Sequence, residues 1–131
     1  MNDLPLMTRA RPAYVEFATT EAALQALRAR MTERDFQAQV VALAKLHGWR
    51  TFHVFDSRHS AAGFPDLTLV RANRDGDGQL LFIELKREGA KPTAAQWEWV
   101  HLLRSVPGVR AFIWRPSDLP TIEKLLKGDI V

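Results

Sequence analysis

The stretch that decides the fold runs from Gly63 to Lys86 and reads GFPDLTLVRANRDGDGQLLFIELK. Its two apolar runs, Leu67–Val70 and Leu80–Lys86, are short and bounded by turn residues, as is typical of β-strands. Residues 73–78 between them are dense in Asn, Asp and Gly, which favours a tight connection. The stretch therefore predicts two strands joined as a hairpin.

Further elements are predicted on both sides of this hairpin. They are a helix over about residues 33–47, a strand over 49–55, the hairpin itself, a helix capped by Thr93 and running to about Ser105, a strand over 109–114, and a last helix from Asp118 onward. Thr32 is placed to cap the first of these helices and Gly48 to end it. Since a strand that returns after a helix lies parallel to an earlier strand, the sequence predicts an α/β fold, with a mixed central sheet flanked by helices in the order α-β-β-β-α-β-α.

The first 31 residues differ from the rest, because Pro5 and Pro12 interrupt a mixed stretch. Thr20 could cap a short helix that places Leu24, Leu27 and Met31 on one face. We interpret residues 1–31 as an accessory segment and residues 32–131 as the main domain.

Composition limits the function classes. The chain has 131 residues, 47% of them hydrophobic and 25% charged, which is typical of one globular domain and excludes a largely disordered chain. It has no cysteine, which excludes a thiolate zinc site and a cysteine nucleophile. No apolar run approaches the roughly 20 residues of a membrane span, and the start lacks a signal-peptide pattern, so a cytoplasmic location without membrane contact is expected. The net charge of +3 favours acidic partners such as nucleic acid only weakly.

Two carboxylates are predicted to meet at one end of the hairpin. Glu84 and Lys86 stand two apart on a strand and so share a face, and Asp66 lies at the start of the partner strand. Each has a simpler reading, as a charged pair facing water or as part of a Pro-Asp turn. Taken together, two adjacent carboxylates would repel each other unless a cation lay between them, and oxygen ligands suit Mg²⁺. The pattern therefore predicts a metal site.

Three motifs in this order resemble the VRR-NUC (virus-type replication-repair nuclease) domain of the PD-(D/E)XK superfamily. They are Gly63-Phe64-Pro65-Asp66, Glu84-Leu85-Lys86 and Lys91-Pro92-Thr93-Ala94-Ala95-Gln96-Trp97, and the resemblance extends from about Thr32 to Trp114. It implies a restriction-endonuclease-like core and a metal-dependent phosphodiesterase acting on DNA. In that family's pattern Asp66, Glu84 and the Leu85 backbone carbonyl would hold Mg²⁺ or Mn²⁺, Lys86 would orient or activate the attacking water, and Gln96 would complete the catalytic set.

Two polar residues keep alternative interpretations. The superfamily often adds an acidic residue from the first helix, and Gln37 resembles that position, with Glu33 as its rival; Gln37 could equally be a polar group at the helix edge. Gln96 has the spacing of a capping box with Thr93, which would make it a structural residue.

DNA contacts are predicted at Ser57, Arg58, Ser60 and Lys91, although the first three could belong to a solvated loop. The resemblance suggests a structure-specific endonuclease that cuts branched DNA, such as a Holliday junction, in replication, repair or recombination in a bacterial or phage-infected cell. The alternatives are a restriction-like, sequence-specific nuclease and a catalytically silent DNA-binding module. Because Trp97 should face outward from its helix, we also predict a homodimer, in which residues 1–31 or a second copy cover this indole.

Overall fold

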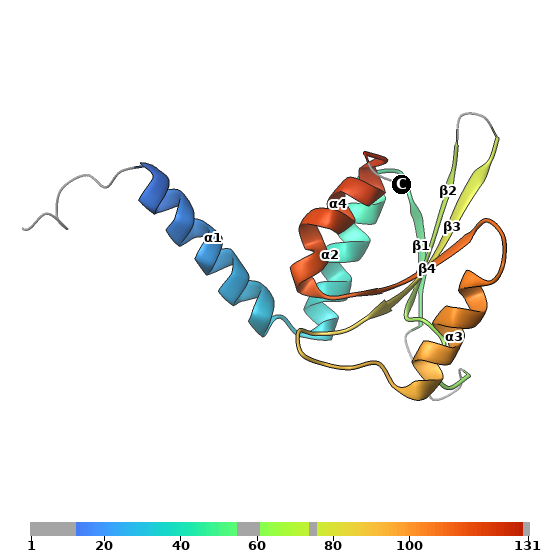
Figure 1. Ribbon diagram of the computed structural model, residues 1–131. Coiled ribbons are helices and arrows are strands. Elements are labelled where there is room, and N and C mark those ends of the chain that lie inside the picture. Colours follow the sequence, from blue (N-terminus) through green and yellow to red (C-terminus); the bar gives the residue numbers. More distant parts are fainter. Residues whose placement is uncertain (1–12, 55–60, 74–75, 130–131) are drawn as a thin grey trace, which may run out of the picture.

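The computed structural model describes residues 13–54, 61–73 and 76–129, and only the backbone of residues 13–19 (Figure 1). The elements are α1 (Ala13–Arg30), α2 (Glu33–Leu46), β1 (Arg50–His53), β2 (Leu67–Ala72), β3 (Gly78–Leu85), α3 (Ala94–Arg104), β4 (Val109–Trp114), the 3-10 turn η3 (Pro116–Asp118) and α4 (Leu119–Lys127). The four strands form one mixed sheet in the order β1-β2-β3-β4, so the predicted α/β class is confirmed.

The hairpin at the centre of the sheet is confirmed. β2 pairs antiparallel with β3 in a register that sets Leu67 opposite Ile83, and β1 pairs antiparallel with the other edge of β2. β4 returns after α3 and lies parallel to β3, as a crossover through a helix requires. These pairings bring the start of β2 and the end of β3 to the same end of the sheet.

The predicted ends of α2 are confirmed by hydrogen bonds. The Thr32 hydroxyl accepts from the Asp35 N–H at 3.1 Å, which satisfies a free donor of the first turn. At the other end Gly48 has φ +85°, and the Trp49 N–H donates to the Ala44 carbonyl at 2.9 Å. This left-handed residue turns the chain sharply from α2 into β1.

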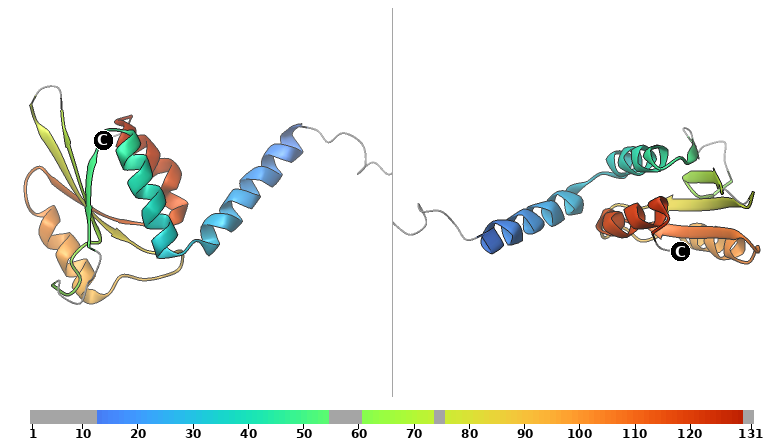
Figure 2. Two further views of the ribbon diagram at one scale, coloured as in Figure 1. Left: turned by 180° about the vertical axis from the view of Figure 1, so that it is seen from behind. Right: turned by 90° about the horizontal axis from the view of Figure 1, so that it is seen from above.

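Helices cover both faces of the sheet (Figures 1 and 2). Alternate residues of β2 and β3 share one face, and the apolar ones there are almost fully buried against α2 and α4. This core includes Phe36, Val40, Leu67, Leu69, Leu81, Ile83, Leu85, Ile122 and Leu126. α3 packs on the other face over β3 and β4, with Val100 fully buried. The result is a three-layer core with the sheet in the middle.

α1 extends away from this core, and its last part packs against η3 (Figures 1 and 2). The helix begins at Ala13, so the prediction that Thr20 caps it is wrong. Residues 13–19 include good helix formers such as alanine and glutamate, and they extend the helix through Thr20. Leu24 and Leu27 are 40% and 64% exposed, so this helix adds little to the core. The boundary between an accessory segment and a main domain at residue 32 stays a prediction.

Arg71 closes the end of the sheet where β2 finishes. Its Nη1 donates to the carbonyls of His47 at 3.2 Å and Leu126 at 2.8 Å. His47 is the C-cap of α2, and Leu126 lies in the last turn of α4. Its guanidinium also lies 4.4 Å from the ring centre of Trp49, whose Nε1 donates to the same Leu126 carbonyl at 3.0 Å. The Arg71 guanidinium thus links the C-terminal ends of two helices to the sheet.

Candidate active site

Asp66 and Glu84 face each other at the opposite end of the sheet. Because Leu67 pairs with Ile83, the residues just beyond them, Asp66 and Glu84, fall opposite each other on the same face. The Leu85 N–H donates to Asp66 Oδ2 at 2.9 Å, which fixes the Asp66 carboxylate beside β3. The predicted meeting of these two residues is therefore present in the structure.

The loop before Asp66 is held against the first turn of α3. Gly63 has φ +82°, and a Cβ at this position would lie 2.5 Å from the Ala95 carbonyl carbon, so only glycine fits. Phe64 packs edge-on against both Phe82 and Trp99, and the Trp99 Nε1 donates to the Ala62 carbonyl at 3.1 Å. These contacts make the position of Asp66 depend on α3 as well as on the sheet.

The pKa values of the Asp66 and Glu84 carboxyl groups are both raised. Burial, followed by the nearby Asp66 carboxylate, raises the pKa of Glu84 from 4.5 to about 8, against a lowering effect of the Lys86 ammonium. Burial also raises the pKa of Asp66, although the hydrogen bond from the Leu85 N–H opposes this. Without a cation, Glu84 therefore holds a proton at neutral pH rather than a charge.

The Glu84 side chain has one oxygen engaged and one free. It is 2% exposed, and Oε1 lies 3.9 Å from Lys86 Nζ. Oε2 is buried without a hydrogen-bond partner among the described residues. Two adjacent carboxylates with a buried free oxygen fit a divalent cation, which would satisfy that oxygen and remove the repulsion. The described residues hold no cluster of three or more Asp, Glu, His or Cys placed for a metal, so such an ion would need a backbone carbonyl or water as well.

A cavity of about 170 Å³ opens beside Asp66, and it is lined by Glu33, Arg34, Gln37, Asp66 and Leu85. Both candidates, Gln37 and Glu33, lie in α2 and line this cavity. The Glu33 charge also contributes to the raised pKa of Asp66 and of Glu84. The structure therefore places both side chains at the carboxylates without selecting one as a ligand.

Gln96 lies in a capping box at the start of α3. Its Oε1 accepts from the Thr93 N–H at 2.8 Å, and its own N–H donates to the Thr93 hydroxyl at 3.2 Å. The structural alternative for this residue is thus realised, and its predicted catalytic role stays a prediction.

Of the predicted DNA contacts, the structure describes Lys91. Lys91 is exposed in the segment before α3 and is not among the residues that line the carboxylate cavity. Ser57, Arg58 and Ser60 lie outside the described residues.

Arg34 is a site residue that the sequence analysis missed. It lies three positions before Gln37 on α2, and residues at this spacing share a helix face. This spacing was the available signal, since any residue on the face of Gln37 near the helix start should approach the same carboxylates.

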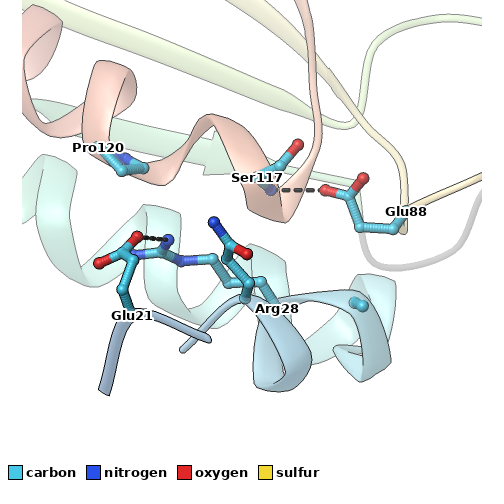
Figure 3. A pocket seen from close by; sticks show the side chains of 7 residues that line it. Glu21, Arg28, Glu88, Ser117 and Pro120 are labelled. Carbon is cyan, nitrogen blue, oxygen red and sulfur yellow. Dashed lines mark hydrogen bonds and ion pairs between the residues drawn. The ribbon is translucent and has the colours of Figure 1, made fainter. Parts of the chain in front are cut away.

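A second cavity of about 390 Å³ lies between α1 and the start of α4 (Figure 3). Its charged side chains already have partners, because Arg28 Nη1 lies 3.9 Å from Glu21 Oε1 and the Ser117 N–H donates to Glu88 Oε1 at 2.6 Å. The described residues that line it include no facing pair of buried carboxyl groups like Asp66 and Glu84, so the end of the sheet that carries Asp66 is the stronger candidate for catalysis.

Comparison with known proteins gives one match. The family model described as the VRR-NUC domain matches residues 13–116, a range that begins in α1 and contains Asp66, Glu84 and Lys86. No curated protein and no solved structure matches the chain. None of the described helices is long and apolar enough to cross a membrane.

Proposed function

The chain belongs to the VRR-NUC domain family, a family of nuclease-type domains, and from this we propose that it is a Mg²⁺-dependent, structure-specific DNA endonuclease. Its substrate is branched DNA, a Holliday junction or a similar structure, met in replication, repair or recombination in the cytoplasm of a bacterial or phage-infected cell. The observation that carries the proposal is the facing pair Asp66 and Glu84, with both pKa values raised and Glu84 Oε2 unpartnered among the described residues.

Asp66, Glu84 and the Leu85 backbone carbonyl would hold Mg²⁺, and Mn²⁺ could replace it. When bound, such an ion polarises the phosphate and lowers the pKa of a water molecule. The protein's part is to hold the ligands in advance: Leu85 N–H orients Asp66, and pairing in the sheet fixes Glu84 on the same face. Gln37, or its rival Glu33, stands across the cavity and would position water or a further ligand.

Lys86 supplies the fixed positive charge of this site. Its side chain is only 12% exposed, and its Nζ lies 3.9 Å from Glu84 Oε1, so the ammonium is restrained next to the carboxylates. A restrained cation stabilises the extra negative charge of the phosphoryl transition state and can orient the attacking water. This role requires the ammonium during the reaction more than during DNA binding.

The test is cleavage of a panel of labelled junctions, flaps, nicked and linear duplexes in Mg²⁺ or Mn²⁺. We expect branched DNA to be cut, and Asp66→Asn and Glu84→Gln to reduce the rate at least ~1000-fold. Glu98→Gln removes an exposed carboxylate from α3 and serves as the matched control with an unchanged rate. Cleavage by Asp66→Asn at the wild-type rate, after removal of contaminating nuclease, would exclude the proposed centre.

The same panel separates the alternatives. A catalytically silent DNA-binding module would bind these DNAs and cut none of them in either metal. A restriction-like enzyme would cut linear duplex at one sequence and ignore branching. Preferential cutting of branched DNA, independent of its sequence, agrees with the proposal.

We propose further that the enzyme acts as a homodimer, since symmetric cutting of two strands needs two sites related by a two-fold axis. Trp97 is 41% exposed and stacks on His101, and α1 packs against η3 rather than α3, so a second copy is the proposed cover for this indole. Sedimentation should give twice the monomer mass, and Trp97→Ala should lower it. A monomer at micromolar concentration would contradict this.

A further inference from the structure

A further hollow lies next to the carboxylate cavity, between α2 and the end of β1. We call it the α2–β1 groove; its volume is about 510 Å³, and its lining residues are Arg34, Gln37, Ala38, Val41, His53 and Val54. Arg34 and Gln37 line both this groove and the cavity that contains Asp66. The two hollows are therefore neighbours that share one wall.

The lining of the groove combines two kinds of surface. Ala38, Val41 and Val54 offer apolar contact, while Gln37 and His53 bring side chains with hydrogen-bonding groups. Unstacked bases are held in this way, with the flat face against apolar or ring atoms and the edge against polar groups. A volume of this size lies within the roughly 300–1,000 Å³ of sites for one small molecule, which suits a single base.

Arg34 stands at the boundary with an uncommitted charge. It is exposed, and it makes no ion pair or hydrogen bond within the part of the chain that the structure describes. A guanidinium binds phosphate through two parallel hydrogen bonds. Negative charge at the Asp66–Glu84 pair would repel the phosphates of an incoming strand, and a cation beside the pair offsets that repulsion.

We propose that the α2–β1 groove binds one unpaired nucleotide of the strand being cut, next to the scissile phosphodiester, with Arg34 holding the phosphate between them. This inference rests on the proposed function, because the reacting phosphate must lie at Asp66 and Glu84. It explains why branched DNA would be preferred. A flap or an opened junction supplies an unpaired nucleotide, whereas in a continuous duplex a nucleotide must first be unpaired and unstacked at a cost in free energy.

The experiment measures binding without cleavage, in protein carrying Glu84→Gln and without metal. Fluorescence anisotropy compares a flap DNA with a continuous duplex of the same length. Arg34→Ala should weaken flap binding about tenfold. It should also reduce the slope of log affinity against log salt concentration by about 1, the amount expected for the loss of one phosphate contact. Ala38→Phe fills the groove without changing charge, and it should weaken flap binding about tenfold but duplex binding less than about twofold.

Lys45→Ala is the matched control, because it removes one exposed positive charge from the same helix about 16 Å from Arg34. It should change the affinity for either DNA less than about twofold. Arg34 and Ala38 are exposed, so the variants should fold, and circular dichroism checks this. Arg34→Gln, which removes the charge but keeps a polar side chain, should reproduce the loss seen with Arg34→Ala.

Two results would overturn the inference: equal effects of Arg34→Ala and Lys45→Ala, or equal loss of flap and duplex binding in Ala38→Phe. Either result leaves the proposed function intact, provided that Glu84→Gln is inactive. If Glu84→Gln still cuts DNA, the proposed centre fails instead, whatever the affinities of the groove variants.

Discussion

The charged side chains at the two ends of β2 differ in whether their surroundings stabilise the charge. Asp66 stands just before the strand and Arg71 near its end, five residues or about 17 Å apart. Arg71 has carbonyl partners from two helices and the ring of Trp49 beneath it. Asp66 faces a second carboxylate, and both have pKa values raised by burial.

This contrast separates stability from chemistry within one strand. Where a buried charge is satisfied, removing it leaves unpaired carbonyls and weakens the fold. Where burial disfavours a charge, removing that carboxylate removes the cost of charging it in the metal-free fold and leaves the site unable to hold its cation. Substitutions at the two ends should therefore have opposite effects on stability and on activity.

The largest effect is expected for Lys86→Ala at the Asp66 end. The rate of cleavage at saturating DNA should fall by about 10²–10³-fold, because a fixed charge aimed at the transition state is lost, while DNA affinity stays within about threefold. Single-turnover cleavage and anisotropy measure the two quantities separately. Arg87→Ala, the exposed neighbour, should retain the wild-type rate. A loss of affinity large enough to explain the whole decrease would make Lys86 a simple phosphate contact.

At the other end, Arg71→Met should lower the free energy of unfolding by about 3 kcal/mol, since the hydrogen bonds to His47, Leu126 and Gln79 and the contact with Trp49 are lost. Arg71→Lys keeps the charge and should lose about half as much. Urea unfolding measures both. The exposed Arg50→Met on β1 should change stability by less than about 0.5 kcal/mol. If Arg71→Met changes the free energy of unfolding as little as Arg50→Met does, then Arg71 does not stabilise its end of the sheet.

Local signals in the sequence were enough for the Asp66 end. The turn residues between the strands predict the hairpin, and the hairpin sets Asp66 opposite Glu84. Each of these inferences depends on neighbours in the chain or on one strand pairing.

The Arg71 end could not be predicted in the same way. The strand pattern in the sequence extends only to Val70, and the partners of Arg71 lie 24 and 55 residues away, at the C-cap of α2 and in α4. Their meeting depends on how two helices pack on the sheet, which periodicity does not give. Arg34 was missed for a related reason, since a charged residue in a first helical turn usually faces solvent.

A smaller effect, opposite in sign to that at Arg71, is expected for Glu84→Gln in metal-free protein. The folded Glu84 has a pKa of about 8 against 4.5, so the folded state binds the proton more tightly and the free energy of unfolding falls as pH rises through this window. The variant lacks this loss. Its melting temperature should exceed that of the wild type by several degrees at about pH 8.5, and by much less at about pH 4.5.

Two controls sharpen the measurement at Glu84. Glu98→Gln, on the exposed face of α3, should give the same difference from the wild type at both pH values. Added Mg²⁺ should raise the melting temperature of the wild type more than that of Glu84→Gln, because only the former keeps both carboxylates. A pH-independent shift in Glu84→Gln would mean that relief of the buried charge is not the cause.

The smallest effect is expected for Gln96→Glu, at the turn that supports the Asp66 loop. A carboxylate oxygen can accept from the Thr93 N–H as the amide oxygen does, so stability should change by less than about 0.5 kcal/mol, whereas Gln96→Ala should lose about 1 kcal/mol. Because Gln96 Oε1 is engaged at Thr93, we expect equal rates for Gln96→Glu and wild type in both Mg²⁺ and Mn²⁺. A changed rate or metal preference at unchanged stability would instead show that the side chain leaves its cap during the reaction, and Gln96 would then belong with Asp66, Glu84 and Lys86 in the catalytic set.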